Sequence, residues 1–302
     1  MQVHRGSASW NPSLQPVLTI GNFDGVHRGH RALVARTREI AATRGAPACV
    51  YTFDPAPVQV LRPDKAPPRV QSLDDKLALL AGLGIDHAIV EPFDRTFARQ
   101  EPADFARGVI AGRLGAQALV LGWDFRFGRG RGGTVEGMRE WLDIPVLQVE
   151  AIVEDGAPIS STRIRALIAE GAVAGAARLL GRSHLLRGTV VHGQARGRTL
   201  GFPTANISPT TALLPPYGVY AVRVERDGER LPGVANLGRR PTFGPRDEGL
   251  EVHLIDWSGD LYGEDLAVEL VARIRGEHSF DGPEALVRQI RADVATAREL
   301  LA

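Results

Sequence analysis

The chain has 302 residues, a length that predicts two domains, and 44% of them are hydrophobic, as in ordinary globular proteins rather than disordered or membrane-spanning ones. Its 36 basic and 35 acidic residues leave a net charge of +1, which argues against a protein that binds nucleic acid through bulk charge. The only lysines are Lys65 and Lys76, and neither follows a glycine, so a Walker-type phosphate loop is excluded. Any bound phosphate must therefore meet backbone N–H groups, arginines, helix N-termini or a metal ion.

The N-terminal segment lacks the features of an export signal. Residues 1–16 contain no apolar core of the length that a signal peptide needs, and no long apolar segment follows them. The lone cysteine, Cys49, lies in an apolar run and can form neither a disulfide framework nor a cysteine-based zinc site. We therefore expect a cytoplasmic protein without a membrane partner.

In chain order, the first half alternates strand-like and helix-like segments. Short β-prone runs predict strands at 17–20, 48–53, 87–93 and 118–122. Apolar residues at helical spacing predict helices at 30–44, 76–83, 103–114, 161–170 and 172–180, three of them ended by Gly84, Gly115 and Gly181. This order predicts an α/β doubly wound parallel sheet with helices on both faces, whose ligands bind at the carboxyl ends of the strands.

Beyond about residue 186 the pattern changes to short β-rich runs separated by turns. The expected strands are 188–191, 218–225, 231–237, 250–257 and 266–275. Their spacing predicts a small antiparallel barrel or sandwich, of which we take the barrel, and the apolar stripe of 283–301 predicts a C-terminal helix. With a boundary near Gly181–Leu186, we expect one domain at residues 1–184 and a second at 185–302.

A segment rich in glycine and histidine joins the first strand to the first helix. It reads Gly21-Asn22-Phe23-Asp24-Gly25-Val26-His27-Arg28-Gly29-His30. Glycines let the backbone approach a ligand closely, and a helix start offers N–H groups and partial positive charge to phosphate. His27 and His30 are three residues apart, so they project to one face of a helix and can donate to an oxyanion. An isolated His-x-x-His favours a surface turn, but the strand before it and the flanking glycines favour a phosphate site.

This decapeptide resembles the His-x-Gly-His signature of the nucleotidylyltransferase superfamily. A second segment, Ile159-Ser160-Ser161-Thr162-Arg163-Ile164-Arg165, resembles the Ile-Ser-Ser-Thr-x-Ile-Arg motif of the same superfamily. The resemblance implies that His27 and His30 stabilise the α-phosphate while AMP is transferred and pyrophosphate leaves. It implies nucleotide-binding roles for Gly21, Asn22, Phe23, Asp24, Gly25, Ser160, Ser161, Thr162, Arg163 and Arg165. The hydroxyls at the start of the second helix also suit an ordinary N-cap, which is compatible with phosphate binding.

Two other strands end in segments that resemble the flavin and nucleotide site of bacterial FAD synthetase modules. These are Thr52-Phe53-Asp54-Pro55 and Gly122-Trp123-Asp124-Phe125-Arg126-Phe127-Gly128, and the second adds Asp124 to the expected ligand-binding residues. The run Gly128–Gly133 is expected to be a phosphate-neutralising loop or simply a solvated one. The chain departs from the family at Ala56, where the family often has a histidine between two prolines.

The most specific stretch of the second half reads Gly193-Gln194-Ala195-Arg196-Gly197-Arg198-Thr199-Leu200-Gly201-Phe202-Pro203-Thr204-Ala205-Asn206. It resembles the Gly-Arg-x-Leu-Gly-Phe-Pro-Thr-Ala-Asn signature of riboflavin kinases, and later segments match that family in order and spacing. With the first half included, the resemblance runs from about Pro16 to Leu301, and the chain is identified as a member of the bacterial bifunctional riboflavin kinase/FAD synthetase family.

The second resemblance implies that Glu251 is the catalytic base and that Thr204 and Asn206 hold Mg²⁺. It implies that ATP binds to Gly193, Gly197, Arg198, Gly201 and Pro203. Phosphorylation of an alcohol independently needs a carboxylate and a metal ion, and hydroxyl and amide oxygens suit a hard cation. Strand alternation also accounts for Glu251 as an outward-facing carboxylate without any catalytic role.

The family resemblance implies two consecutive reactions. ATP phosphorylates riboflavin to FMN, and a second ATP then adenylylates FMN to FAD and releases pyrophosphate. One alternative is a riboflavin kinase whose N-terminal half is a degenerate, regulatory nucleotide-binding domain. In this alternative, the replacement of the family's histidine by Ala56 indicates the degeneration. Another alternative is an RNA-binding surface on the barrel, which the balanced charge disfavours, so no nucleic-acid partner is expected.

Overall fold

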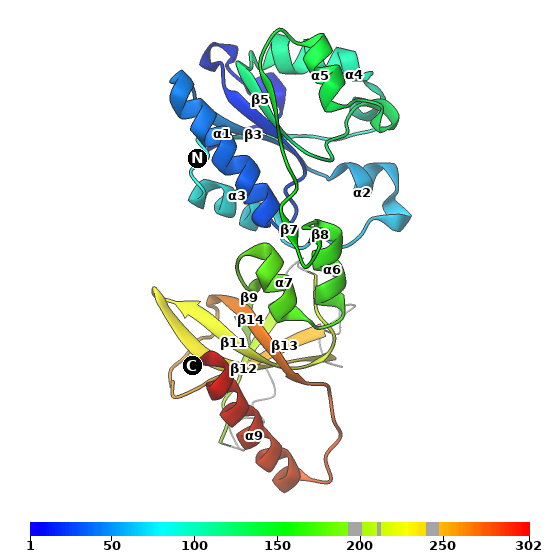
Figure 1. Ribbon diagram of the computed structural model, residues 1–302. Coiled ribbons are helices and arrows are strands. Elements are labelled where there is room, and N and C mark those ends of the chain that lie inside the picture. The colour runs from blue at the N-terminus through cyan, green and yellow to red at the C-terminus, as the bar shows by residue number, and fades with distance from the viewer. Residues whose placement is uncertain (193–200, 210–212, 240–247) are drawn as a thin grey trace. The chain divides into compact units, whose positions relative to one another are not determined.

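The computed structural model describes residues 1–192, 201–209, 213–239 and 248–302 (Figure 1). Contacts divide the chain into two compact units. The first comprises Met1–Pro68 and Leu73–Ser160, and the second comprises Arg69–Ser72 and Ser161–Ala302. The described part of the chain contains no helix with the length and hydropathy that a membrane crossing requires.

Six parallel strands form the sheet of the first unit. In spatial order they are β1 (Gln2–Arg5), β4 (His87–Glu91), β3 (Ala48–Phe53), β2 (Val17–Ile20), β5 (Ala118–Gly122) and β6 (Val146–Val149). The order reverses at β2, because β3 pairs with one side of β2 and β5 pairs with the other. The carboxyl ends of β2, β3 and β5 therefore meet at the position where an open sheet of this kind binds its ligands.

Helices cover both faces of this sheet, as the sequence predicts. The helices of this unit are α1 (Arg28–Arg44), α2 (Pro57–Leu61), α3 (Leu73–Gly82), α4 (Pro102–Asp104), the π-helix η5 (Phe105–Arg113) and α5 (Val135–Trp141), and α2 and α4 contribute no buried residue. Adjacent residues of β2 enter opposite apolar layers: Val17 packs with side chains of α1 and α3, and Leu18 packs with side chains of η5 and α5. The doubly wound α/β architecture is therefore confirmed (Figure 1).

Several features of the first unit differ from the expected elements, and the short helices α2 and α5 are among the elements that were not expected. Strand β1 pairs with β4 at the edge of the sheet, and its side chains are exposed or half-exposed, so it lacks the apolar pattern that marks buried strands. Strand β6 was likewise not expected. Most of the helix expected at 103–114 is a π-helix, in which the Leu114 N–H donates to the carbonyl of Val109, five residues earlier.

Six antiparallel strands of the second unit close into a barrel, which confirms the predicted β-barrel. Around the barrel they are β10 (Ala205–Pro209), β13 (Glu248–Leu254), β12 (Glu229–Arg239), β11 (Gly218–Arg226), β14 (Asp265–Arg275) and β9 (His184–Val191). Buried apolar side chains, among them Leu186, Ile207, Tyr220 and Val252, fill its interior. Strand β10 was not expected, because it begins within the Pro-Thr-Ala-Asn stretch, and proline and asparagine favour turns.

Two helices precede the barrel in the chain and belong to the same compact unit. Helices α6 (Ser161–Ala169) and α7 (Val173–Leu180) pack together, and Val173 joins the apolar cluster inside the barrel. The sequence pattern groups these helices with residues 1–184, because they continue the alternation of the first half. The limits 1–184 and 185–302 for the two catalytic domains remain a prediction.

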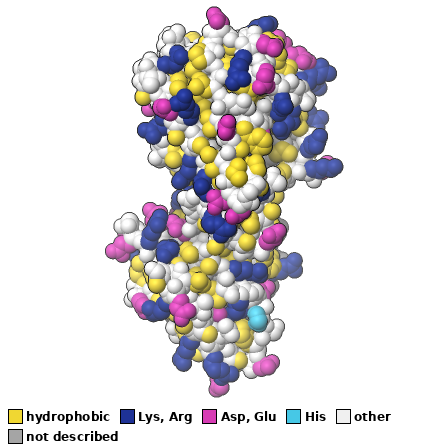
Figure 2. Space-filling model, in the orientation of Figure 1, with side chains coloured by type: hydrophobic (Ala, Val, Ile, Leu, Met, Phe, Trp, Pro, Cys, Tyr) yellow, Lys and Arg dark blue, Asp and Glu magenta, His cyan; other side chains and the backbone are white. Residues whose placement is uncertain are grey.

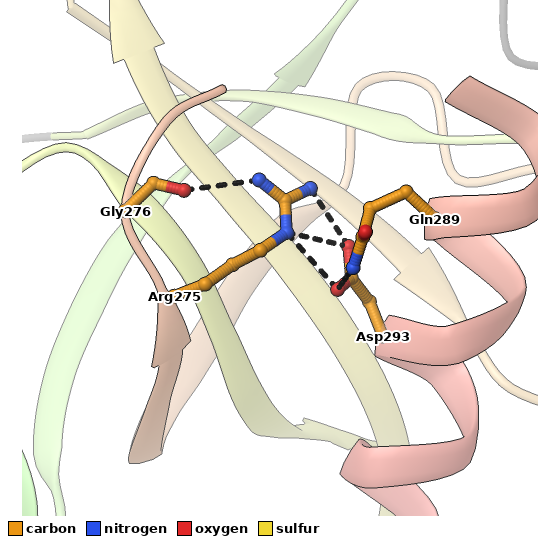
Figure 3. A network of polar contacts seen from close by, with 4 residues as sticks. All are labelled: Arg275, Gly276, Gln289 and Asp293. Carbon is orange, nitrogen blue, oxygen red and sulfur yellow. Dashed lines mark hydrogen bonds and ion pairs between the residues drawn. The ribbon is translucent and has the colours of Figure 1, made fainter. Parts of the chain in front are cut away.

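The C-terminal helix α9 (Pro283–Leu301) has the predicted bounds and is tied to the barrel by a buried ion pair (Figure 3). The Arg275 guanidinium, at the end of β14, donates to both carboxylate oxygens of Asp293 at 2.8–3.1 Å and to the carbonyl of Gly276. Gln289 donates to the same carboxylate at 2.9 Å. Ala297 packs on the outer face of β11 and β12, so α9 covers that side of the barrel.

Candidate active sites

The loop between β2 and α1 is held in an unusual backbone conformation by its own apolar side chains. Phe23 and Val26 are fully buried, and both have positive φ angles, +50° and +39°. Such a conformation is rare for residues other than glycine, and for β-branched Val26 it is a genuine outlier. Gly25, between them, has φ +86°. Strain of this kind persists where the surrounding packing enforces it, and it clusters at functional sites.

His27 and His30 lie face to face at the start of α1. Their ring centroids are 3.6 Å apart with an interplanar angle of 18°. His27 is the N-cap of the helix, and its Nδ1 accepts a hydrogen bond from the His30 N–H at 3.3 Å. A neutral imidazole whose Nδ1 accepts a hydrogen bond carries its proton on Nε2. Nε2 of a neutral His27 is therefore a hydrogen-bond donor. A Cβ at Gly29 would lie 3.1 Å from the His27 ring, so a side chain there would disturb the pair.

His30 is held in its neutral form. Its pKa is lowered well below the usual value, first by burial and then by the neighbouring charges of His27 and Lys76. Its Nδ1 is buried, and among the described residues it has no hydrogen-bond partner. Two stacked imidazoles at a helix N-terminus can donate hydrogen bonds to a phosphate oxygen whose negative charge grows during a reaction.

The structure shows that Lys76 of α3 contacts this loop, and the sequence analysis did not assign Lys76 to the site. Its side chain is only 7% exposed, and its Nζ donates to the carbonyl of Asn22 at 3.2 Å and to Thr52 Oγ1 at 3.1 Å. A signal was available, because Lys76 stands between Leu73, Leu77 and Leu80 on the apolar stripe of α3. A lysine on such a stripe is buried, and buried lysines are rare unless they have partners.

The other expected residues of the first site have different surroundings. Gly21 ends β2, and Asp24 is half-buried within the loop, whereas Asp124 follows β5 and is exposed. Arg28 forms an ion pair of 2.6 Å with Glu154 of the small hairpin made by β7 (Val153–Glu154) and β8 (Ala157–Pro158). This pair ties the hairpin to the first turn of α1.

The Ser-Ser-Thr-Arg segment spans the junction of the two units. Ser160 is the last residue of the first unit, and Ser161, Thr162, Arg163 and Arg165 lie in the first turns of α6 in the second. Their role in a nucleotide site therefore remains a prediction. The run 128–133 forms a short 3-10 turn, closed by the Phe127–Gly133 bridge, in which exposed Arg129 pairs with Glu101 at 3.0 Å.

Three polar residues form a row across the outer face of the barrel. Glu251 on β13 lies directly opposite Asn206 on β10 and, on its other side, directly opposite Asn236 on β12. Their sequence neighbours Ile207, Leu250 and Ala235 belong to the interior cluster, so the row faces outward. Directly opposite residues of antiparallel strands have Cβ atoms about 4.5–5.5 Å apart, so one small group can contact the carboxylate and both amides. Asn236 was not among the expected site residues.

The segment that leads into β10 is fixed next to this row. His253 Nδ1 donates to the carbonyl of Pro203 at 2.9 Å, and its ring packs edge-to-face against Phe202 at 5.4 Å. Thr204 is half-buried, and Gly201, which is exposed, has a left-handed φ of +85°. The expected ATP-binding residues Gly193, Gly197 and Arg198 lie outside the described residues.

The residues of this row fit a hard cation that keeps part of its own hydration. The donor set of Thr204 and Asn206 consists of hydroxyl and amide oxygens, with the Glu251 carboxylate on the same row. Mg²⁺ binds through few protein oxygens and completes its shell with water and substrate phosphates. The described residues contain no group of three or more His, Cys, Asp or Glu side chains that could hold a metal ion.

Comparisons with known proteins match a family to each half of the chain. The family description "FAD synthetase" matches residues 11–163, and "Riboflavin kinase" matches residues 180–301. The bifunctional riboflavin kinase/FMN adenylyltransferase of Escherichia coli strain K12 is 43% identical, over 99% of this chain and 97% of the relative. The chain belongs to this family. The riboflavin kinase/FMN adenylyltransferase of Bacillus subtilis strain 168 is 39% identical over 92% of this chain and 90% of its own length.

The fold is shared with a solved structure as well. A crystal structure described as a macrolide-efflux protein from Streptococcus pneumoniae superposes with a TM-score of 0.90 at 30% identity and covers 99% of both chains. Within this riboflavin kinase/FMN adenylyltransferase family member, the His27–His30 pair lies in the FAD synthetase match. The Asn206–Glu251 row lies in the riboflavin kinase match.

Proposed function

We propose that this chain converts riboflavin to FMN and then FMN to FAD, using one ATP in each step. The first step transfers the γ-phosphoryl group of ATP to riboflavin, and the second transfers AMP to FMN with loss of pyrophosphate. The observation that carries the proposal is the presence of two separate polar constellations, one in each compact unit, each inside a match to the corresponding family.

In the kinase step, Glu251 is the group that orients the primary alcohol of riboflavin and takes its proton. The carboxylate lies on β13 directly opposite Asn206 on β10, and a carboxylate in this position is the type of group that the reaction requires. Thr204 and Asn206 would hold Mg²⁺, which would offset the negative charge of the ATP phosphates. By the family resemblance, the segment that contains Gly193, Gly197 and Arg198 supplies the remaining contacts to the ATP phosphates.

In the adenylyl-transfer step, His27 and His30 donate hydrogen bonds to the α-phosphate of ATP as FMN attacks it. Their stacked arrangement places both rings at the start of α1, and His30 is neutral there because burial and the nearby charges of His27 and Lys76 lower its pKa. The start of α1 adds the partial charge of its N-terminus.

Two observations favour this function over the alternatives. The FAD synthetase match extends over residues 11–163, and the Gly21–His30 segment is complete, which supports two activities rather than a kinase with a regulatory half. Ala56, the residue on which the kinase-only alternative depends, is the N-cap of α2, and its backbone N–H donates a hydrogen bond to Gln59 Oε1 at 3.0 Å. On the face seen in Figure 2, basic and acidic side chains are interspersed, which disfavours an RNA-binding surface.

The test is product analysis with the purified full chain. Incubation with riboflavin, ATP and Mg²⁺ is expected to give FMN and then FAD on reversed-phase chromatography, and incubation with FMN and ATP is expected to give FAD and pyrophosphate. Accumulation of FMN with no FAD from either substrate would support the kinase-only alternative. Formation of neither product would refute the proposal.

A further inference from the structure

Lys76 is one of only two lysines in the chain, and it is the buried one. Lys65, at the end of a short 3-10 turn, is exposed, whereas Lys76 is 7% exposed within the apolar stripe of α3. Removal of an ammonium group from water carries a large free-energy cost, and a buried charge is weak support for stability. A lysine in this place therefore calls for a role other than packing.

The contacts of Lys76 join two strand ends at the carboxyl edge of the sheet. Its ammonium group donates to the carbonyl of Asn22, which follows β2, and to the hydroxyl of Thr52, near the end of β3. The Thr52 hydroxyl in turn donates to the same Asn22 carbonyl at 3.3 Å. Thr52 is fully buried, and these three groups form one connected set of hydrogen bonds next to the loop.

This set of hydrogen bonds fixes the orientation of one peptide unit in the loop. Because a trans peptide is planar, with its C=O and N–H directed oppositely, a carbonyl of Asn22 held by Lys76 directs the N–H of Phe23 away from α3. Phe23 has the left-handed φ of +50°, and its ring packs 5.1 Å from that of His30. The position of Lys76 is therefore coupled to the conformation of the loop and to the ring of His30.

We propose that Lys76 is a positioning residue for the adenylyl-transfer site: its buried ammonium group holds the Asn22 carbonyl, sets the conformation of the Gly21–Val26 loop and provides a fixed positive charge beneath the His27–His30 pair. The inference rests on the proposed function of that site. Lys76 touches neither substrate nor reacting atoms in this account; it acts through the loop and through the charge state of His30.

The charge of Lys76 has a consequence that is separate from the reaction. The titratable or charged groups that act on His30 are His27, stacked on it from the helix N-cap, and Lys76 from α3, while Phe23 is an uncharged neighbour. Both groups oppose protonation of His30, in addition to its burial. Removal of the Lys76 charge is therefore expected to raise the pKa of His30 toward its ordinary value of about 6.5.

The test compares K76M, K76R and the control K65M in the full chain. K76M replaces the lysine by an unbranched apolar side chain and so removes the positive charge. The Asn22 carbonyl still accepts a hydrogen bond from Thr52 Oγ1 in this variant. We expect kcat/KM for FAD formation from FMN to fall about 10- to 100-fold in K76M. K76R should recover part of the loss, and K65M should equal the wild type. FMN formation from riboflavin in the same preparations serves as an internal control and should not change.

The second readout is the pKa of His30, measured by ¹H NMR titration of its imidazole, which is assigned by its disappearance in H30Q. The pKa is expected to rise in K76M and to stay at the wild-type value in K76R and K65M. FAD formation by K76M within twofold of the wild type, or an unchanged pKa of His30, would overturn the proposal. Should K76M not fold, K76R carries the test, and a raised pKa of His30 in K76R would overturn the role of the charge.

These readouts separate the inference from the proposed function. A wild-type chain that forms no FAD from FMN refutes the proposed function of the site. In that event the titration of His30 still applies, and an unchanged pKa in K76M would separately refute the assignment of Lys76.

Discussion

Glu251 on β13 lies directly opposite Asn206 on β10, and both side chains face outward from the barrel. This pairing leads to the first prediction. Replacement of Glu251 by Gln keeps the shape of the side chain but removes its basicity, so kcat for FMN formation should fall at least about 100-fold, with a smaller change in KM for riboflavin. The exposed variant E229Q, on β12, is the matched control and should retain full activity. A kcat for E251Q within threefold of the wild type would contradict the role of the carboxylate.

The second prediction concerns Asn206 as a magnesium ligand. Loss of its amide oxygen in N206A should raise the Mg²⁺ concentration required for half-maximal FMN formation by about tenfold or more. The Mg²⁺ dependence of FAD formation from FMN, measured on the same preparation, should not change, because Asn206 belongs to the barrel. An identical shift in both reactions would point to a general effect on folding instead.

The third prediction follows from His184, a buried residue at the start of β9 that donates to the carbonyl of Leu213 at 2.7 Å. Burial lowers the pKa of His184 from 6.5 to about 4. Between these pH values the unfolded chain binds a proton at this ring and the folded chain does not, so the free energy of unfolding should decrease as the pH falls. At about 1.4 kcal/mol per pH unit, the loss by pH 4 is on the order of 3 kcal/mol.

The measurement for His184 is a series of urea unfolding curves between pH 7 and pH 4. His30 also has a lowered pKa and contributes a decrease of the same sign, so the informative quantity is the difference between the wild type and H184Q. The stability of H184Q should depend less steeply on pH. Equal slopes for the two proteins would exclude His184 as a source of the pH dependence.

The fourth prediction concerns the ion pair that ties α9 to the barrel (Figure 3). Arg275 and Asp293 are 17% and 4% exposed, and removal of one partner leaves the other charge buried. D293A should therefore lower the free energy of unfolding by about 3–5 kcal/mol, whereas the apolar double variant R275M/D293L should recover most of that loss. R298A, which breaks the exposed Arg298–Asp256 pair, is the control and should cost less than about 1 kcal/mol. Equal losses in D293A and R298A would contradict the account.

Much of the fold can be predicted from the sequence because its strands are short, apolar and bounded by glycines. The bounds of β2, β3 and β5 agree with the expected ones, and so do those of α9. The edge strand β1 cannot be found in this way, because its exposed side chains have no apolar alternation. Nor can strand β10, because its pairing with β9 and β13 depends on residues far away in the chain.

The site is predictable in its residue types but not in its local chemistry. The sequence places His27 and His30 three residues apart, yet only the structure shows that His27 caps the helix and accepts from the His30 N–H. Alternation indicates that Glu251 faces outward, but it does not identify Asn206 and Asn236 as its neighbours. Lys76 is distant in sequence from the loop that it holds, so its contacts depend on the packing of α3 against the sheet.

The most direct test of the central claim, that one chain carries two separable sites, is a complementation assay with two inactive variants. E251Q should convert FMN to FAD but not riboflavin to FMN, and H27A/H30A should stop at FMN. Neither variant alone is then expected to make FAD from riboflavin, ATP and Mg²⁺, whereas an equimolar mixture should do so, because FMN released by one is used by the other. A mixture that forms FMN but no FAD, although E251Q alone adenylylates added FMN, would show that FMN is not passed between chains. Loss of both activities in either folded variant would contradict the two-site account.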